Sequence, residues 1–391
     1  MRRSDLPDCC LSNRIDVLRV LHCINRLHDA DGGPTRSVPA LAAAEAAIGA
    51  DVRLWTGLSP ADSKFVTEFA DVQFCNGPFE QLLLHGWRPD VIHDHGLWLS
   101  SNRAVARLSR RLRICRLVSP RGMLAPWCMR HHRFRKQLAW KLYQYRDLVS
   151  ASALHATSPS EAEHFRQLGL SCRVLCVPNG VELPDAGSAR SNCKQPGQRE
   201  ILFLSRLHPV KGLLNLIEAW TRCRRPGWRL RIVGDSYAGH REVIIRRLES
   251  DREARSTVLV QDAVHSEEKW QLLRNADVLI LPSFSENFGV VCAEALAVGT
   301  PVITTTGTPW NQLGAQRCGW YVDPTPENIA AAIREAMDLP QEDLSAMGRR
   351  GQKWVRKEFS WQDIGRRMLQ AYSEVASEFK RVEQPRRRKA A

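Results

Sequence analysis

The sequence has no run of about 18 apolar residues, the length that a helix needs to cross a bilayer. Residues 1–8 also lack the apolar core of a signal peptide. The twelve cysteines show no paired CxxC spacing, and no cysteines and histidines stand at zinc-finger intervals. We therefore expect a cytoplasmic chain with reduced thiols that is neither exported nor membrane-spanning.

Acidic residues are missing from residues 103–146, which carry thirteen Lys and Arg residues. The formal net charge of the whole chain is +14, so the charge of this one stretch nearly equals the net positive charge of the chain. Apolar and aromatic side chains interleave with its cations, namely Trp127, Phe134, Leu138, Trp140, Leu142, Tyr143 and Tyr145. A face of this kind suits an anionic membrane surface, where each nearby cation contributes about 1 kcal/mol.

The same basic stretch would also fit an ordinary solubilising helix face or a surface that binds nucleic acid. The complete absence of acids disfavours the solubilising face. The chain shows no sequence pattern of a nucleic-acid module, which disfavours nucleic-acid binding. We expect an anionic membrane surface as a partner, and no nucleic acid.

Short apolar runs alternate with helical patterns in both halves of the chain, as an α/β protein requires. A polar, Gly/Ser/Pro-rich segment at residues 185–198 separates the halves and predicts a linker. With 391 residues, the chain is long enough for two domains. Strands are predicted at residues 17–23, 51–55, 90–93, 114–119, 153–156, 173–177, 200–204, 229–233, 257–260, 278–281 and 301–304.

Two carboxylates, Glu286 and Glu294, flank Gly289 where an apolar strand gives way to a helix. Free backbone N–H groups at Phe288 and Gly289 would attract an anion by about 0.3–1 kcal/mol per charge. An ionised Glu accepts hydrogen bonds and donates none, which suits sugar hydroxyls. The pair indicates a ligand that is anionic at one end and hydroxyl-rich at the other. Taken alone, the pair is better interpreted as two solvated surface carboxylates.

Two cations, Arg206 and Lys211, lie on either side of a Pro-stiffened turn after the apolar run 200–204. At the carboxyl end of a strand they are placed to neutralise a diphosphate, Arg through its planar fork and Lys as a mobile point charge. A Gly-rich turn at residues 31–34, which includes Gly33, could cradle phosphate through its backbone, although it is not a GxGxxG motif. Two surface cations are the plainer alternative for Arg206 and Lys211.

In combination, these motifs resemble those of the retaining glycosyltransferases of family 4. The pieces at residues 120–124 and 308–310 look like the branch that builds bacterial exopolysaccharide, capsule or lipopolysaccharide. The resemblance covers about residues 18–375 and is specific only in combination. In the family's order, the motifs are residues 31–34, 91–98 (VIHDHGLW), 119–127 (SPRGMLAPW), 156–158 (ATS), 177–180 (VPNG), 205–212 (SRLHPVKG), and Glu286 with Glu294.

The resemblance implies the GT-B fold, in which two Rossmann-like doubly wound domains face each other across a cleft. Residues 14–184 would form the acceptor-side domain and residues 199–365 the nucleotide-sugar domain. A helix over residues 366–380 would cross back to the first domain. We expect residues 381–391 to form a disordered basic tail.

The family's reaction implies transfer of a hexosyl unit from a nucleotide diphosphate sugar, with retention, to a saccharide or polyprenyl-linked acceptor. Arg206, Lys211 and the helix start at residues 288–289 would take the charge of the leaving phosphate. Asn287 would also bind the donor. Glu294 would bind the ribose, Glu286 the hydroxyls of the donor sugar, and Gly33 would face the diphosphate. No cofactor and no metal are expected, since no Asp-x-Asp lies in a suitable loop.

One position departs from the family. Many members carry a His where this chain has Arg121, and a guanidinium cannot accept a proton, although it could stabilise the leaving phosphate. The motif His93-Asp-His95 also invites a metal-hydrolase interpretation, which the lack of further ligands disfavours. We expect His93 to be a hydrogen-bonded strand residue, and His95, on the loop after the strand, to line the acceptor cleft in place of the missing His.

Other activities stay open on the same scaffold. A hydrolase or epimerase would turn over nucleotide sugar without an acceptor, and a non-catalytic protein would bind it without turnover. The sequence favours the transferase, acting in the cytoplasm and peripherally on the inner face of the cell membrane.

Overall fold

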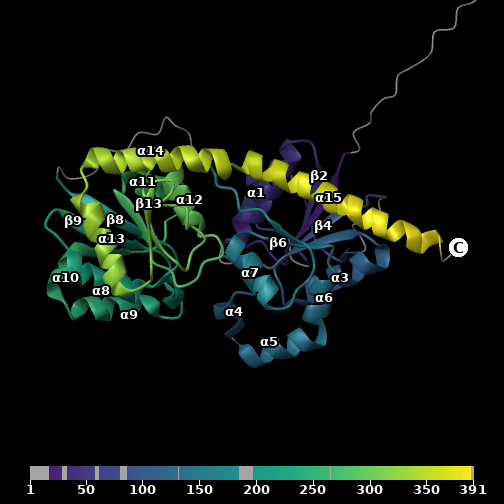
Figure 1. Ribbon diagram of the computed structural model, residues 1–391, viewed down its shortest axis with the longest axis horizontal. Helices are drawn as coiled ribbons and strands as arrows, with labels where there is room; N and C mark the ends of the chain where they lie inside the picture. Colours follow the sequence, from purple (N-terminus) through teal and green to yellow (C-terminus); the bar gives the residue numbers. More distant parts are fainter. Residues whose placement is uncertain are drawn as a thin grey trace, which may run out of the picture.

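The computed structural model describes residues 17–28, 33–57, 61–79, 86–130, 132–184, 197–264 and 266–388. They form two α/β domains side by side, the N-terminal domain on the right of Figure 1 and the C-terminal domain on the left. The expected pair of Rossmann-like domains is confirmed. Asp31, Gly32 and residues 185–196 of the predicted linker lie outside the described residues.

The N-terminal domain is built on a seven-stranded parallel sheet with strand order β3-β2-β1-β4-β5-β6-β7. The order reverses between β1 and β4, which pair in register with His22 beside His93. Ligands of doubly wound folds bind outside the carboxyl ends of the strands at such a reversal. The strands are β1 (Arg19–Cys23), β2 (Asp51–Trp55), β3 (Gln73–Cys75), β4 (Val91–His95), β5 (Cys115–Ser119), β6 (Ala153–Ala156) and β7 (Val174–Cys176).

The helices of the N-terminal domain connect these strands. A basic segment follows β5 and consists of three short α-helices with a π-helical turn among them. The helices are α1 (Pro34–Ala47), α2 (Ser63–Glu68), α3 (Ser100–Leu112), α4 (Pro126–Arg130), α5 (Arg133–Ala139), the π-helix η3 (Trp140–Gln144), α6 (Tyr145–Val149) and α7 (Pro159–Gln167).

The C-terminal domain repeats the architecture with a six-stranded parallel sheet of order β10-β9-β8-β11-β12-β13. Its reversal lies between β8 and β11. The strands are β8 (Arg199–Leu204), β9 (Trp228–Val233), β10 (Val258–Gln261), β11 (Val278–Leu281), β12 (Val302–Thr305) and β13 (Gly319–Val322). The helices are the 3-10 helix η4 (Pro209–Lys211), α8 (Leu213–Cys223), α9 (His240–Glu249), α10 (Arg252–Thr257), α11 (Ser266–Asn275), α12 (Val290–Ala297), α13 (Pro326–Asp338) and α14 (Gln341–Glu358).

Every strand that the sequence predicts is present, with ends that differ by at most two residues. The sequence misses β3 and β13, each of which lies at one edge of its sheet. Their residues are half-buried or exposed, whereas the central strands are buried along their length. Because the prediction depended on apolar runs, it found the edge strands β7 and β10, each of which has a buried residue, and missed β3 and β13, which have none.

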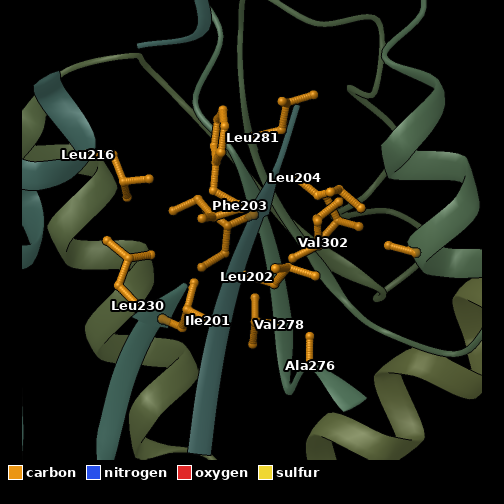
Figure 2. Packing of buried hydrophobic residues seen from close by; sticks show 14 of the residues in the cluster. Ile201, Leu202, Phe203, Leu204, Leu216, Leu230, Ala276, Val278, Leu281 and Val302 are labelled. Atoms are coloured by element: carbon orange, nitrogen blue, oxygen red, sulfur yellow. The ribbon is translucent and has the colours of Figure 1, made fainter. Parts of the chain in front are cut away.

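The core of the C-terminal domain surrounds its central strand. Figure 2 shows Ile201, Leu202 and Phe203 of β8 among side chains from the neighbouring strands and from α8. All three are fully buried. Side chains that point to opposite faces of one strand are thus both covered, as a parallel sheet between two helix layers requires. The carboxyl end of β8 is thereby held rigidly.

The last helix, α15 (Trp361–Arg388), returns to the N-terminal domain. Figure 1 shows α14 and α15 in sequence along one side of both domains. Ile364, Met368 and Tyr372 are buried against residues of α1. The expected crossing helix is therefore longer than residues 366–380, and the expected disordered tail is wrong as far as Arg388, because the basic residues continue the helix. Residues 389–391 lie outside the described residues.

The two segments that connect the domains lie against each other. Val181 donates its backbone N–H to the carbonyl oxygen of Phe359 at 2.8 Å, and forms an isolated bridge with Ser360. A Cβ atom at Gly180 would overlap the indole of Trp361, so glycine is needed there for the close approach. Both connections are thus joined at one point beside the N-terminal domain.

None of the helices in the described ranges has the length and apolarity needed to span a membrane.

Because one face of α15 is buried, we expect substitutions on that face to lower the stability of the protein. Met368 is fully buried against the N-terminal core, whereas Gln370, two residues later, is exposed. Met368→Ala should lower the free energy of unfolding by about 2–5 kcal/mol through lost burial and a cavity. Gln370→Ala should change it by about 0.5 kcal/mol or less. Equal midpoints in chemical denaturation of the two variants would contradict the packing.

Candidate functional site

Two loops meet at the carboxyl ends of β8 and β11, on either side of the reversal in the C-terminal sheet. Phe284 donates its backbone N–H to the carbonyl oxygen of Val210 at 2.8 Å. Gly212 has φ +69°, and a Cβ there would overlap the carbonyl oxygen of Pro282. The loop after β8 and the loop after β11 therefore form one surface, at the position where doubly wound domains bind ligands.

The structure brings Lys211 and Glu286 together as an ion pair. Their side chains are 14% and 12% exposed, and Ser283 donates its hydroxyl to Glu286 at 2.8 Å. The pair fixes the loop after β11 against the loop after β8. Both residues lie at the predicted place, with Lys211 bound to the carboxylate in this structure.

Arg206, at the end of β8, differs from Lys211. Its side chain is exposed, and it makes no ion pair within the described part of the chain. A guanidinium in this position is free to take up a phosphate bidentately.

The start of α12 has the features of an anion site. Gly289 caps the helix with φ +72° and ψ 58°, and as a glycine it has no side chain to accept from the first N–H groups. Trp310 donates its indole N–H to the carbonyl oxygen of Phe288 at 2.6 Å, and the two rings pack 5.3 Å apart. The loop before the helix is thus fixed by Trp310, which the sequence pattern did not assign to the site.

Glu294 lies within α12 and pairs with Lys269 of α11 at 2.8 Å. Lys269 also lies over the ring of Trp270. The predicted ribose-binding carboxylate is therefore positioned by a cation that sequence reasoning missed, since no spacing rule links residues 25 positions apart.

In the N-terminal domain, the predicted donor-binding residue Gly33 is the N-cap of α1. Its backbone is right-handed, and a Cβ built there would meet nothing within 4 Å. Neither its backbone conformation nor a neighbouring protein atom requires glycine at this position. The space beside the helix start is therefore open.

Side chains of the two domains are in contact near these loops. Asn287 donates its amide N–H to the hydroxyl of Thr157 at 2.7 Å, across the domain interface. The ring of Trp127 in α4 packs against His208 with centroids 5.3 Å apart. The loops of the C-terminal domain therefore face the N-terminal domain.

Arg121 lies in a left-handed turn with φ +55° and is buried. Its guanidinium donates to Asn179 at 2.6 Å and lies 3.2 Å from Nδ1 of His95. Burial lowers the pKa of Arg121 to about 10, against the nearby charge of Glu161. The guanidinium thus points into the N-terminal domain and is bound by protein groups, whereas a role at the leaving phosphate would need it to face the donor.

His95 lies elsewhere than expected. It is the last residue of β4 rather than a loop residue, and it is 2% exposed. The prediction failed because the strand continues for two residues beyond the apolar run that marked it. His93 is the hydrogen-bonded strand residue that the sequence predicts, bound by the hydroxyl of Tyr372 at 2.6 Å.

Four buried histidines form a layer on one face of the N-terminal sheet. His22 connects Nε2 to Glu45 at 2.7 Å and Nδ1 to Nε2 of His95 at 3.0 Å. His155 connects Nδ1 to His93 at 3.2 Å and Nε2 to the carbonyl oxygen of Val177. These contacts form two hydrogen-bond series. One runs from Glu45 through His22 and His95 to Arg121. The other runs from Tyr372 through His93 and His155 to Val177.

This histidine layer is the group in the described ranges that could hold a metal. Ligand atoms of His22, His93 and His95 lie within 4.8 Å of one another. Every ring nitrogen of the three already has a protein partner, so an ion would have to displace hydrogen bonds. Burial lowers the pKa of His93 and His95 well below the usual value, and that of His155 to about 3, so these rings are neutral.

Two protein-family models match the chain. The model described as "Glycosyl transferase 4-like domain" matches residues 32–180, and "Glycosyl transferases group 1" matches residues 188–354. Together they follow the two domains of the fold.

Individual relatives are distant. The glycogen synthase of Mycobacterium tuberculosis is 28% identical over 312 residues, which are 77% of this chain and 72% of the relative. The Escherichia coli K12 protein named "putative colanic acid biosynthesis glycosyltransferase WcaL" is 32% identical over 183 residues, 43% of each chain. The structure of Anabaena HepE with UDP-glucose superposes with a TM-score of 0.71 at 18% identity, covering 91% of this chain and all of HepE. At this identity the superposition shows the fold, which is GT-B.

The histidine layer predicts a loss of stability in mild acid. In the unfolded chain a histidine takes up a proton below about pH 6.5, whereas the buried neutral rings do not. The free energy of unfolding is therefore highest above pH 6.5 and falls as the pH is lowered, by about 1.4 kcal/mol per pH unit for each such ring. Asp94, whose pKa burial raises to about 7, acts in the opposite direction and offsets one ring.

Denaturant unfolding between pH 7.5 and 5.5 measures this slope. A His155→Gln variant should lose less stability, by about 1.4 kcal/mol summed over this pH range, whatever its stability at pH 7.5. An unchanged slope would mean that His155 is not held neutral.

Proposed function

The chain carries a glycosyl transferase 4-like domain followed by a glycosyl transferases group 1 domain, and from this we propose that it transfers a hexosyl unit from a nucleotide diphosphate sugar with retention. The acceptor is a saccharide or a lipid-linked saccharide of a bacterial surface polysaccharide. The observation that carries the proposal is the meeting of Arg206, Lys211, Glu286 and the start of α12 at the reversal of the C-terminal sheet.

Charge complementarity supports the roles of these residues. Breaking the anomeric bond leaves negative charge on the departing phosphate, and Arg206, Lys211 and the N–H groups after Gly289 supply fixed positive charge and dipole there. In this assignment Lys211 turns from Glu286 to the phosphate when the donor binds, which releases Glu286 for sugar hydroxyls. Glu294, held by Lys269, accepts the hydroxyls of the ribose. No metal and no cofactor take part.

The polysaccharide assignment has separate support. The pieces at residues 120–124 and 308–310 resemble the exopolysaccharide branch of the family, and WcaL, named for colanic acid biosynthesis, aligns over 183 residues. HepE, whose structure contains UDP-glucose, supports a nucleotide sugar as donor.

The structure changes the roles that we assign to Arg121 and His95 of the N-terminal domain. Arg121 and His95 are bound to each other and buried, so we assign them to positioning the turn at residues 120–123 rather than to proton transfer. The acceptor's proton then passes to the leaving phosphate itself.

Transfer is tested by incubating the protein with labelled nucleotide sugars, with and without a polyprenyl-linked acceptor. Acceptor-dependent transfer supports the proposal. Acceptor-independent turnover would identify a hydrolase or epimerase, and binding without turnover a non-catalytic protein.

Arg206→Ala should lower kcat/KM by about 100-fold to 1000-fold, because a preorganised charge at the leaving group is lost. Arg246→Ala is the matched control, since Arg246 is exposed on α9, where it contacts the backbone of its own helix. The control should keep its activity. Equal activity of the two variants would remove Arg206 from the diphosphate site.

The basic segment supports peripheral binding to the inner face of the cell membrane. Phe134, Leu138 and Leu142 are 84%, 60% and 65% exposed. Exposed cations surround them on α4, α5, η3 and α6, namely Arg130, Arg133, Arg135, Lys141 and Arg146. Helix α5 of this segment lies at the lower edge of Figure 1, away from α15. Apolar side chains among cations suit an anionic lipid surface, which binds both.

Vesicle sedimentation tests this face. The protein should bind phosphatidylglycerol vesicles at low salt and be released at high salt, and the triple change of Phe134, Leu138 and Leu142 to Ala should weaken binding. Leu259→Ala, an exposed leucine of the C-terminal domain, is the control. Equal recovery with neutral and anionic vesicles would exclude the membrane role.

A further inference from the structure

Asn287 is the residue of the β11–α12 loop that reaches the other domain. Its neighbours on both sides are fixed within the C-terminal domain, Glu286 by Lys211 and Phe288 by Trp310. Its own side chain instead donates to Thr157 at 2.7 Å. The position of the N-terminal domain and the conformation of the donor loop are therefore linked through this one side chain.

Thr157 is oriented from beneath by Glu161. The Thr157 hydroxyl donates to Oε2 of Glu161 at 3.1 Å, and the Thr157 backbone N–H donates to the same oxygen at 2.8 Å. Both Thr157 and Glu161 are buried. Because the hydroxyl has a single proton and gives it to Glu161, it can only accept from Asn287.

Glu161 also holds the second surface that Asn287 touches. Its Oε1 accepts the backbone N–H of Gly122 at 2.6 Å. Gly122 has φ +78°, and a Cβ there would lie 3.0 Å from Cβ of Asn287. All the partners of the carboxylate donate to it, so it binds them in its ionised form.

Helix capping alone does not account for this arrangement. Ser158 caps α7 by accepting the N–H of Glu161 at 3.2 Å, and a glutamate at this position commonly reaches back to the helix start. Capping requires no bond to Gly122, which is 39 residues earlier in the chain. The second oxygen of Glu161 therefore serves the domain interface.

The amide of Asn287 is thereby oriented. Its N–H groups face the accepting hydroxyl of Thr157, and its carbonyl oxygen Oδ1 is buried beside Gly122, without a partner among the residues that the structure describes. The amide is thus enclosed by groups of the N-terminal domain that Glu161 holds in place. The enclosed amide fixes the loop that carries Glu286, the residue assigned to the donor sugar.

We propose that Thr157 and Glu161 are positioning residues that hold Asn287, and through it the donor-sugar loop with Glu286, when the domains are together. The proposal rests on the proposed function and adds two residues of the N-terminal domain to the support of the donor site. It also makes the donor site conditional, since the N-terminal domain must be in place before Asn287 is held.

Substitutions at Thr157 separate the hydroxyl from its packing. Thr157→Val keeps the shape and removes the hydroxyl, whereas Thr157→Ser keeps the hydroxyl. We expect Thr157→Val to raise KM for the nucleotide sugar and lower kcat/KM about tenfold or more, and Thr157→Ser to stay within about threefold of the wild type. Affinity for the nucleoside diphosphate without sugar should be unchanged in both, with UDP and UDP-glucose as the first probe pair.

A double-mutant cycle tests the dependence on Asn287. In an Asn287→Ala background, Thr157→Val should have no further effect on kcat/KM, because the side chain that it orients is gone. Additive losses, or equal activities of the Val and Ser variants, would overturn the proposal.

Thermal unfolding distinguishes this proposal from the proposed function. Coupling between Thr157→Val and Asn287→Ala in stability requires no substrate, and it should be present even in a protein without transferase activity. Coupling without transfer would leave the contact between Thr157 and Asn287 intact and reject the transferase. Transfer without coupling would support the transferase and reject the contact between Thr157 and Asn287.

Discussion

The structure depends on the reversal of strand order in each parallel sheet. The chain runs from β1 to β2 but from β4 to β5, in opposite directions across the sheet, and likewise from β8 to β9 but from β11 to β12, and ligands of doubly wound folds bind at such a reversal. The core around β8 fixes the strand ends there, since its side chains are buried on both faces. Each candidate residue of the C-terminal domain lies on the loop after β8, on the loop after β11 or on the helix that follows.

Much of this was accessible from the sequence, because burial leaves a periodic signal. The strands and the two domains followed from apolar runs, whereas the common site of Lys211 and Glu286 followed from the family resemblance, and their ion pair was not predicted. The edge strands β3 and β13 escaped because none of their residues is buried. Partners such as Lys269 and Trp310 escaped because they come from distant segments, and no local pattern records a contact made by folding.

The N-terminal domain shows where one-dimensional inference ends. A polar motif after an apolar strand suggested an exposed His95, yet the sheet continues and buries it among other histidines. Burial is acceptable there because each ring nitrogen has a partner, a condition that involves α1, α15 and three strands together. The basic tail gave the opposite error, since a run of cations was taken as disorder while it continues a helix.

The contact of Gly180 with Trp361 limits how the molecule can open. Because the two chain connections touch at one point, that point can act as a hinge, and rotation about it is the easy relative motion of the domains. Residues close to the hinge, such as Phe359 and Val181, keep their contacts during the rotation. Displacement grows with distance from the hinge, and the hydrogen bond between Asn287 and Thr157 is the kind of contact that such a rotation makes or breaks.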